Sequence, residues 1–262
     1  MVELGSVGFQ ETDSFLLSYF DKSRWSDDSF DRFKNDLRLL LQKVSVNADV
    51  RFQEIREENW NEQWEKTIQP IEIGERFTIK PSWSEYNNRD HRIVIQIDPK
   101  MSFGTGYHET TRLILRLLEK YVVEGSTVLD VGTGTGILAI GSVKLGAASA
   151  VGIDIDDWSI QNAQENILSN KVAGRVVISD RPLDTFDSSS VDLIAANLTL
   201  NTNIQLLNQF LRVLKTKGVL ILSGLLLGDH DAITEHLVEK RFHILDELIE
   251  NEWIAITAQK TQ

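Results

Sequence analysis

From about residue 108 to the C-terminus, short apolar segments alternate with amphipathic ones, and this alternation restricts the possible folds most strongly. Segments such as 150–153 and 219–223 are apolar at nearly every position, which is typical of strands buried on both faces of a parallel sheet. The amphipathic segments between them predict helices that cover those faces. The last two predicted strands are joined by a tight turn at residues 250–252, so they must pair antiparallel. The sequence therefore predicts an α/β protein.

The N-terminal region has a different pattern. Residues 15–20 predict a buried strand, and residues 29–42 predict a helix with its aromatic and leucine side chains on one face. Residues 50–53 alternate between apolar and polar side chains, which predicts a second strand. Elements of this number and length enclose only a small core. We therefore expect a small α+β domain at residues 1–57.

A charged segment follows this small domain. Trp60 and Trp64 are four residues apart, so they share one face of a helix, and we expect a linker helix at residues 58–70. The larger domain is expected at residues 71–262 and includes an alternating strand at 92–98. Its predicted helices are 109–121, 137–145, 159–168, 204–214 and 232–239, and its other predicted strands are 127–131, 150–153, 176–178, 191–195, 219–223, 242–250 and 253–258.

The composition narrows the possible partners and compartments. Lys and Arg number 27 and Asp and Glu number 39, so the net charge is −12 at pH 7. This balance argues against broad nucleic-acid binding, which needs a basic surface, and it suits a basic partner or only solubility. The sequence has no cysteine, no apolar run of membrane-spanning length and no secretory signal pattern, so we expect a cytoplasmic protein. The histidines lack metal-ligand spacing, so we expect no metal site.

The clearest local pattern is a glycine-rich turn between a strand and a helix. The strand runs into Gly132, Gly134 and Gly136, and the helix follows at once. Glycine lets the backbone approach a ligand where a Cβ would clash, and ligands of open α/β sheets bind beyond the carboxyl ends of the strands. Dinucleotide-binding spacing would place another glycine at Ile137 or Ala139, so the spacing disfavours a dinucleotide without excluding it. A turn that binds nothing is the other alternative.

Carboxylates follow the next two strands. Asp154 ends the second strand of the sheet region, where an acidic side chain accepts hydrogen bonds from ribose hydroxyls, each worth roughly 1.5–3 kcal/mol. A nucleoside is therefore the expected ligand. Asp156 and Asp157 are better explained as helix-capping residues. Asp180 follows the third strand, where it suits the edge of an adenine or an ordinary loop equally well.

Two more segments offer groups to a ligand. Asn197 stands where the apolar run of the fourth strand ends, and its amide offers a donor and an acceptor to a substrate amine. A turn asparagine is the alternative. Residues 98–111 form a glycine-rich loop that leads into a helix, and such a loop can fold over a ligand and exclude water. Thr110 and Thr111 could serve that purpose or only begin the helix.

These segments together, in this order, resemble the PrmA family, the S-adenosylmethionine-dependent methyltransferases of ribosomal protein L11. The resemblance covers most of the chain, because the Trp60-x-x-x-Trp64 segment and residues 74–83 also look like that family's linker region. It implies a class I methyltransferase (Rossmann-like) domain and an N-terminal domain that recognises the ribosomal protein. The segments that carry it are Phe103-Gly104-Thr105-Gly106-x-His108-x-Thr110-Thr111, Leu129-Asp130-Val131-Gly132-x-Gly134-x-Gly136-Ile137-Leu138-Ala139-Ile140, Gly152-Ile153-Asp154-Ile155-Asp156 and Ala196-Asn197-Leu198.

The resemblance also implies which residues contact the cofactor, S-adenosyl-L-methionine. The contacts that it implies are Thr111, Gly132, Asp154 and Asn197. To these the expected set adds residues from the same segments and from the end of the third strand, namely Phe103, Thr110, Gly134, Gly136 and Asp180. The sequence departs from the family at Tyr107 and Glu109, where members often have a small residue and proline, and at Thr199 and Leu200, where an alanine-containing run is commoner. The N-terminal domain also looks short, as if an opening strand and much of a helix were missing. These departures affect the expected substrate recognition more than the expected cofactor binding.

The expected reaction is methyl transfer to lysine or N-terminal amines of ribosomal protein L11, with Asn197 as the catalytic residue that orients the amine. No strong base is required, because desolvation beside a positive sulfonium lowers the pKa of the amine. His108 could accept a proton or only pack and cap the loop. The alternatives are a class I methyltransferase that acts on a small molecule or RNA, a non-catalytic nucleotide-binding module and a nicotinamide oxidoreductase.

Overall fold

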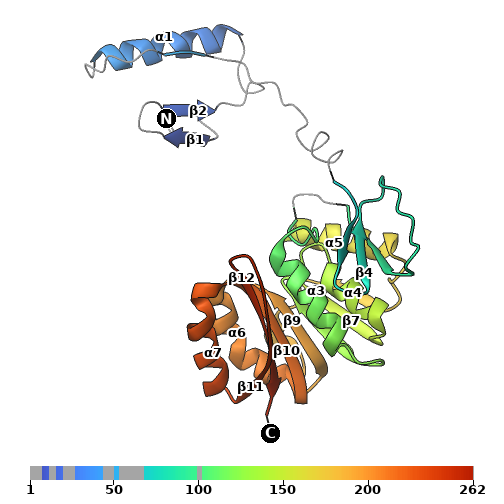
Figure 1. The fold of residues 1–262 in the computed structure, drawn as a ribbon. Coiled ribbons are helices and arrows are strands. Elements are labelled where there is room, and N and C mark those ends of the chain that lie inside the picture. The colour runs from blue at the N-terminus through green and yellow to red at the C-terminus, as the bar shows by residue number, and fades with distance from the viewer. Residues whose placement is uncertain are drawn as a thin grey trace. The chain divides into compact units, whose positions relative to one another are not determined.

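The computed structural model describes residues 8–11, 16–19, 27–43, 50–52, 68–98 and 102–261. The chain divides into two compact units, Met1–Glu58 and Asn59–Gln262, and Figure 1 shows the elements of each. Most of the expected linker helix, with Trp60 and Trp64, lies outside the described residues.

The first unit contains a β-hairpin and one long helix. Strands β1 (Gly8–Glu11) and β2 (Leu16–Tyr19) pair antiparallel, and α1 (Asp27–Lys43) follows. On α1, Phe30 stacks on Phe33, and Phe52 packs edge-on against Phe30 with ring centroids 5.8 Å apart. Strand β2 and helix α1 were predicted, β1 was not, and the prediction of a strand over residues 50–52 was wrong. The apolar side chain of Phe52 serves to pack on the aromatic face of α1 rather than on a sheet.

The second unit is built on a seven-stranded sheet with the order β11-β12-β10-β9-β6-β7-β8. Strands β6 to β10 all run in the same direction. Strand β12 pairs antiparallel with both β10 and β11, as predicted. The strands are β6 (Thr127–Val131), β7 (Ser149–Ile153), β8 (Val176–Ser179), β9 (Val191–Asn197), β10 (Leu214–Leu226), β11 (Phe242–Glu250) and β12 (Trp253–Lys260).

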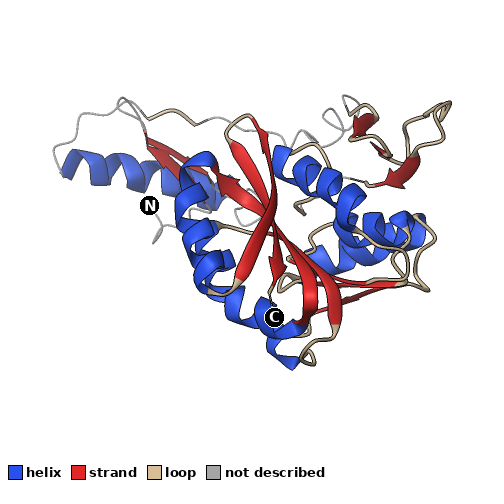
Figure 2. Ribbon diagram, turned by 60° about the horizontal axis from the view of Figure 1, so that its bottom comes forward, coloured by secondary structure: helices blue, strands red, loops and turns tan. Residues whose placement is uncertain are grey.

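Helices cover both faces of this sheet (Figure 2). One apolar core lies on the side of α3 and α4 and includes Leu113, Leu117 and Ile140. The core of the opposite face includes Phe210 of α6 and Leu237 of α7. Burial of both faces explains the apolar character of inner strands such as β9, whereas the edge strand β11 alternates between exposed and half-buried side chains. The helices are α3 (Glu109–Tyr121), α4 (Ile137–Leu145), α5 (Asp157–Ser169), α6 (Leu200–Val213) and α7 (His230–Glu239).

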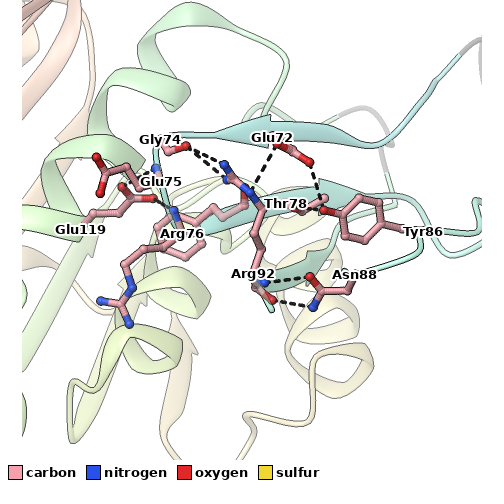
Figure 3. Close-up of polar contacts among 10 residues, drawn as sticks. Glu72, Gly74, Glu75, Arg76, Thr78, Tyr86, Asn88, Arg92 and Glu119 are labelled. Carbon is pink, nitrogen blue, oxygen red and sulfur yellow. Dashed lines mark hydrogen bonds and ion pairs between the residues drawn. The ribbon is translucent and has the colours of Figure 1, made fainter. Parts of the chain in front are cut away.

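A second, three-stranded sheet precedes α3 in the chain. It consists of β3 (Ile71–Ile73), β4 (Phe77–Lys80) and β5 (Ile93–Gln96), with β4 in the middle. The carboxylate of Glu119 on α3 accepts hydrogen bonds from the backbone N–H groups of Glu75 and Arg76 at 3.0 and 2.9 Å (Figure 3). Arg92 donates from its guanidinium to the carbonyl oxygen of Gly74 in the same turn. The Glu119 bonds anchor the turn between β3 and β4 to the helix that begins at the candidate site, and the Arg92 bonds tie this turn to the segment before β5.

A buried carboxyl group joins β6 to α4. The Oδ2 atom of Asp130 accepts hydrogen bonds from the Thr133 hydroxyl at 2.7 Å and from the Ala139 N–H at 3.1 Å. Its Oδ1 atom is buried without a hydrogen-bond partner. Burial raises the pKa of Asp130 to about 7, although the two hydrogen bonds act in the opposite direction. Protonation of Asp130 is therefore linked to the stability of the glycine-rich turn.

The variant Asp130→Asn should remove this pH dependence. Because the pKa of Asp130 is about 7 in the folded protein and near 3.8 when unfolded, the folded state holds the proton between these values. The carboxyl group's contribution to the free energy of unfolding is thus largest at low pH and is lost as the pH rises toward 7. Urea unfolding from pH 5 to 8 should show wild type losing stability relative to Asp130→Asn up to about pH 7. A difference that stays constant over this range would contradict the prediction.

Candidate functional site

The register of the sheet brings the predicted site residues to one edge. Strands β6, β7 and β8 are parallel, and their last residues lie side by side. The residues that follow them are Gly132, Asp154 and Asp180, and the neighbouring strand β9 ends at Asn197. The structure therefore places all four positions at the carboxyl edge of the sheet, where ligands of open α/β sheets bind.

The glycine-rich turn lies against two other segments of the chain. Gly132 and Gly134 have φ angles of 74° and 53°. A Cβ at Gly132 would lie 2.6 Å from the Leu198 side chain, and a Cβ at Gly134 would lie 2.4 Å from the carbonyl oxygen of Phe103. Both positions therefore need glycine because of the protein's own packing. Gly136 ends the turn as the N-cap of α4.

The carboxylate of Asp154 joins its own turn to the glycine-rich turn. Its Oδ2 atom accepts a hydrogen bond from the Gly134 N–H at 2.9 Å, and its Oδ1 atom accepts bonds from the Ile155 and Asp156 N–H groups. The side chain of Ile155 is 99% exposed, although it lies among acidic residues in the sequence. Asp156 is the N-cap of α5 and accepts a bond from the Ser159 N–H, which confirms its predicted capping role.

The loop at residues 102–108 is tied to the glycine-rich turn. The carbonyl oxygen of Phe103 accepts a hydrogen bond from the Thr135 N–H at 2.9 Å, and the Thr135 hydroxyl donates to the carbonyl oxygen of Gly104 at 2.5 Å. The Tyr107 hydroxyl donates to the carbonyl oxygen of Gln69 at 2.6 Å, and burial raises the pKa of Tyr107 to about 12. The aromatic ring of Phe103 is 86% exposed. The loop thus has a fixed backbone and offers a free apolar side chain.

The first turn of α3 contacts the end of β9. Thr110 and Thr111 are both buried in this turn, which confirms that they begin the helix. The hydroxyl oxygen of Thr110 accepts a hydrogen bond from the Asn197 side-chain amide at 3.1 Å. The two segments are 87 residues apart in the sequence. This contact connects the glycine-rich loop before α3 to the predicted catalytic residue.

Several contacts around this loop had no signal in the sequence. Arg112 forms an ion pair with Glu250 at 2.6 Å, and Asn251 donates to the Glu109 carboxylate at 3.0 Å. Such pairs join segments about 140 residues apart, and periodicity cannot reveal them. The exposure of Ile155 could have been expected, because an apolar residue within an acidic turn has no core to enter.

Within the described ranges, no helix combines the length and the apolar character that crossing a bilayer requires. Among the same residues, no three His, Cys, Asp or Glu side chains gather closely enough to bind a metal ion.

Comparisons with known proteins agree with this geometry. The family model described as ribosomal protein L11 methyltransferase (PrmA) matches residues 4–261. A protein of Dictyoglomus turgidum named ribosomal protein L11 methyltransferase is 36% identical over 252 residues, which cover 96% of this chain and 83% of that protein. A protein of Alkaliphilus oremlandii with the same name is 34% identical over 251 residues, which cover 95% of this chain and 80% of that protein.

A solved structure agrees as well. The ribosomal protein L11 methylase of Lactobacillus delbrueckii subsp. bulgaricus superimposes with a TM-score of 0.69 at 31% identity, and the match covers 74% of this chain and 100% of that chain. The predicted class I methyltransferase fold with an antiparallel last strand is confirmed, and the methyl donor is S-adenosylmethionine. The chain belongs to the PrmA family.

Proposed function

We propose that this enzyme transfers methyl groups from S-adenosylmethionine to lysine or N-terminal amines of ribosomal protein L11. The observation that supports this most is that Asp154, the glycine-rich turn and Asn197 lie at one edge of the sheet. The loop at residues 102–108 is bonded to the glycine-rich turn, and Thr110 in the first turn of α3 is bonded to Asn197. This arrangement offers one site for a nucleoside and one for an amine. The cytoplasm, where ribosomal proteins are assembled, is the compartment in which we place the reaction.

The residues present suit the methyl donor. The Asp154 carboxylate is only partly buried, and it suits the two ribose hydroxyls. We assign the amino-acid portion to the glycine-rich turn, where the positive φ angles of Gly132 and Gly134 shape the backbone at the end of β6. The exposed apolar side chains of Phe103 and Ile155 suit the faces of the purine. We further assign donor contacts to Thr110, Thr111, Gly136, Asp180 and Asn197.

The chemistry requires a neutral amine in the correct orientation. When bound, the donor supplies an activated methyl group on a positively charged sulfur. A lysine with a pKa near 10.4 is almost fully protonated at pH 7, which costs about 4.6 kcal/mol, and desolvation in the closed site reduces this cost. The side-chain oxygen of Asn197 can accept a hydrogen bond from the amine and so direct its lone pair.

We assign recognition of the ribosomal protein to the N-terminal domain, residues 1–57. Residues 1–69 carry 14 acidic and 9 basic side chains, and the whole chain has a net charge of −12. An acidic enzyme attracts a basic protein substrate over several ångströms and speeds their encounter. We therefore expect association with ribosomal protein L11 to weaken as the salt concentration rises.

Mass spectrometry tests the proposed function directly. Purified ribosomal protein L11, incubated with the enzyme and S-adenosylmethionine, should gain mass in steps of one methyl group on lysine or N-terminal amines. Parallel incubations with ribosomal RNA and with a metabolite extract serve as controls for the other substrate classes. Methyl incorporation into RNA or a metabolite, with none into ribosomal protein L11, would refute the proposal.

The variant Asp154→Ala should weaken binding of S-adenosylmethionine roughly 10- to 100-fold, because the ribose loses a charged hydrogen-bond acceptor. Isothermal titration calorimetry measures this affinity. Asp156→Asn is the matched control, because it removes a nearby negative charge but keeps the N-cap of α5. Equal losses of affinity in both variants would point to a general effect of charge instead of a ribose contact.

The variant Asn197→Ala should lower kcat roughly 10- to 100-fold, since the amine loses the group that orients it. The dissociation constant of S-adenosylmethionine should change less than kcat does. Single-turnover methylation of ribosomal protein L11 gives the rate, and calorimetry gives the affinity. A methylation rate equal to that of wild type would remove Asn197 from the proposed mechanism.

A further inference from the structure

We propose that His108 is a positioning residue that fixes the orientation of the Asn197 side chain through the hydroxyl group of Thr110. The three side chains form one hydrogen-bonded row. The Asn197 Nδ2 atom lies 3.1 Å from the Thr110 Oγ1 atom, which lies 2.9 Å from the His108 Nδ1 atom. The inference rests on the proposed function, in which Asn197 orients the acceptor amine.

The direction of this row follows from a backbone contact. The N–H of Thr110 donates to the His108 Nδ1 atom at 3.3 Å, so this ring nitrogen acts as the acceptor and the donor N–H of the ring is at Nε2. The Thr110 hydroxyl must then donate its proton to Nδ1 as well. Its oxygen in turn accepts from the Asn197 Nδ2 atom.

This direction decides which end of the Asn197 amide faces the substrate. Because the NH₂ group of Asn197 is engaged by Thr110, the carbonyl oxygen Oδ1 is the atom left for the acceptor amine. An imidazole with a proton on Nδ1 would place a donor opposite both donors of Thr110. The row would then reverse, and the amide would turn its NH₂ group toward the amine, where it would donate to the lone pair that must attack the methyl group.

The β11–β12 turn holds His108 in this position. The Trp253 ring packs edge-on against the imidazole, with ring centroids 4.9 Å apart. The Glu109 Oε2 atom is 3.9 Å from Nδ1, which is beyond hydrogen-bond distance, and Asn251 at 3.0 Å and Arg112 at 3.3 Å both contact the other oxygen, Oε1. Arg112 also donates to the carbonyl oxygen of Tyr107, the residue before His108. No carboxylate oxygen of Glu109 is therefore within hydrogen-bond distance of Nδ1, and this nitrogen is left to accept from Thr110.

His108 is also the N-cap of α3, and this second role must be separated from the first. The cap uses only the backbone N–H of Thr110, whereas the proposed role uses its hydroxyl. The variant Thr110→Val keeps the backbone N–H and the shape of the side chain but removes the hydroxyl. If His108 only caps α3, His108→Ala should lower kcat by the same factor in wild type and in Thr110→Val. A double-mutant cycle therefore distinguishes the two roles.

The experiment compares wild type, His108→Ala, Thr110→Val and the double variant in the full chain, with saturating S-adenosylmethionine and ribosomal protein L11. Each single substitution should lower kcat roughly 5- to 30-fold, and the double variant should be no slower than the slower single variant. Urea unfolding reports the capping role separately, because loss of the cap should lower stability by a similar amount in both backgrounds.

Two further variants sharpen the test. His108→Asn supplies an oxygen acceptor to the Thr110 N–H and hydroxyl, so it should restore kcat to within about threefold of wild type. His243→Ala, which removes an exposed histidine of β11, should leave kcat unchanged. Two results would overturn this inference and leave the proposed function intact. One is a double variant whose loss of kcat equals the product of the two single losses, and the other is a His108→Asn variant as slow as His108→Ala. A wild-type enzyme that methylates no amine of ribosomal protein L11 would overturn the proposed function and this inference with it.

Discussion

The candidate site depends on the register in which β6 pairs with its two parallel neighbours. Val131 lies opposite both Ile153 of β7 and Ala196 of β9. The next residue of each strand is therefore a site position, and the three positions leave the sheet at the same level. Side chains of a strand alternate between its two faces, so a slip of one residue would move every side chain of the strand from one apolar core to the other. Burial of both faces makes such a slip costly and so fixes the site.

The glycine-rich turn also holds the loop at residues 102–108 in place, because the two segments pack closely. Thr135 donates its backbone N–H to Phe103, and a Cβ at Gly134 would collide with the same carbonyl oxygen. The turn and the loop at residues 102–108 therefore form one unit, with the Asp154 carboxylate fastened to it from the other side. A substitution at Gly134 would displace the loop as well as any ligand, so a loss of activity there cannot be attributed to donor binding alone.

Local pattern was enough to predict most of the sheet domain. Helices α3 and α4 begin and end at the predicted residues. The apolar periodicity of α3 marks its extent, whereas α4 is buried at residues 137–143 on all sides and is bounded by Gly136 and Gly146. Helix α6 begins at Leu200 instead of residue 204, since the Asn203 side chain donates to the carbonyl oxygens of Leu198 and Ser223 and holds the first turn on the sheet. This tertiary contact overrides the weak helix propensity of Asn and Thr. Strand β10 likewise begins at Leu214, before the predicted residue 219.

The sequence could place the candidate ligands at strand ends, but it could not show what holds them. The expected role of Asp154 was to bind a ribose, and the structure adds its bond to the Gly134 N–H, 20 residues away. Asn197 was expected to face an amine, and its contact with Thr110 depends on the pairing of distant segments. Neither contact can be predicted from sequence periodicity, because each involves a single polar residue at the end of a helix or strand.

The antiparallel direction of the last strand explains how the C-terminal hairpin reaches this edge. Strand β10 runs parallel to β9 and ends at Leu226, beside the end of β9. Because β12 runs against β10, its first residue Trp253 pairs with Leu226, at the carboxyl edge of the sheet. A parallel β12 would begin at the opposite edge, and the β11–β12 turn could not contact His108 or Arg112. The topology that distinguishes this sheet from an all-parallel one is therefore also the reason that a C-terminal turn can support the loop over the site.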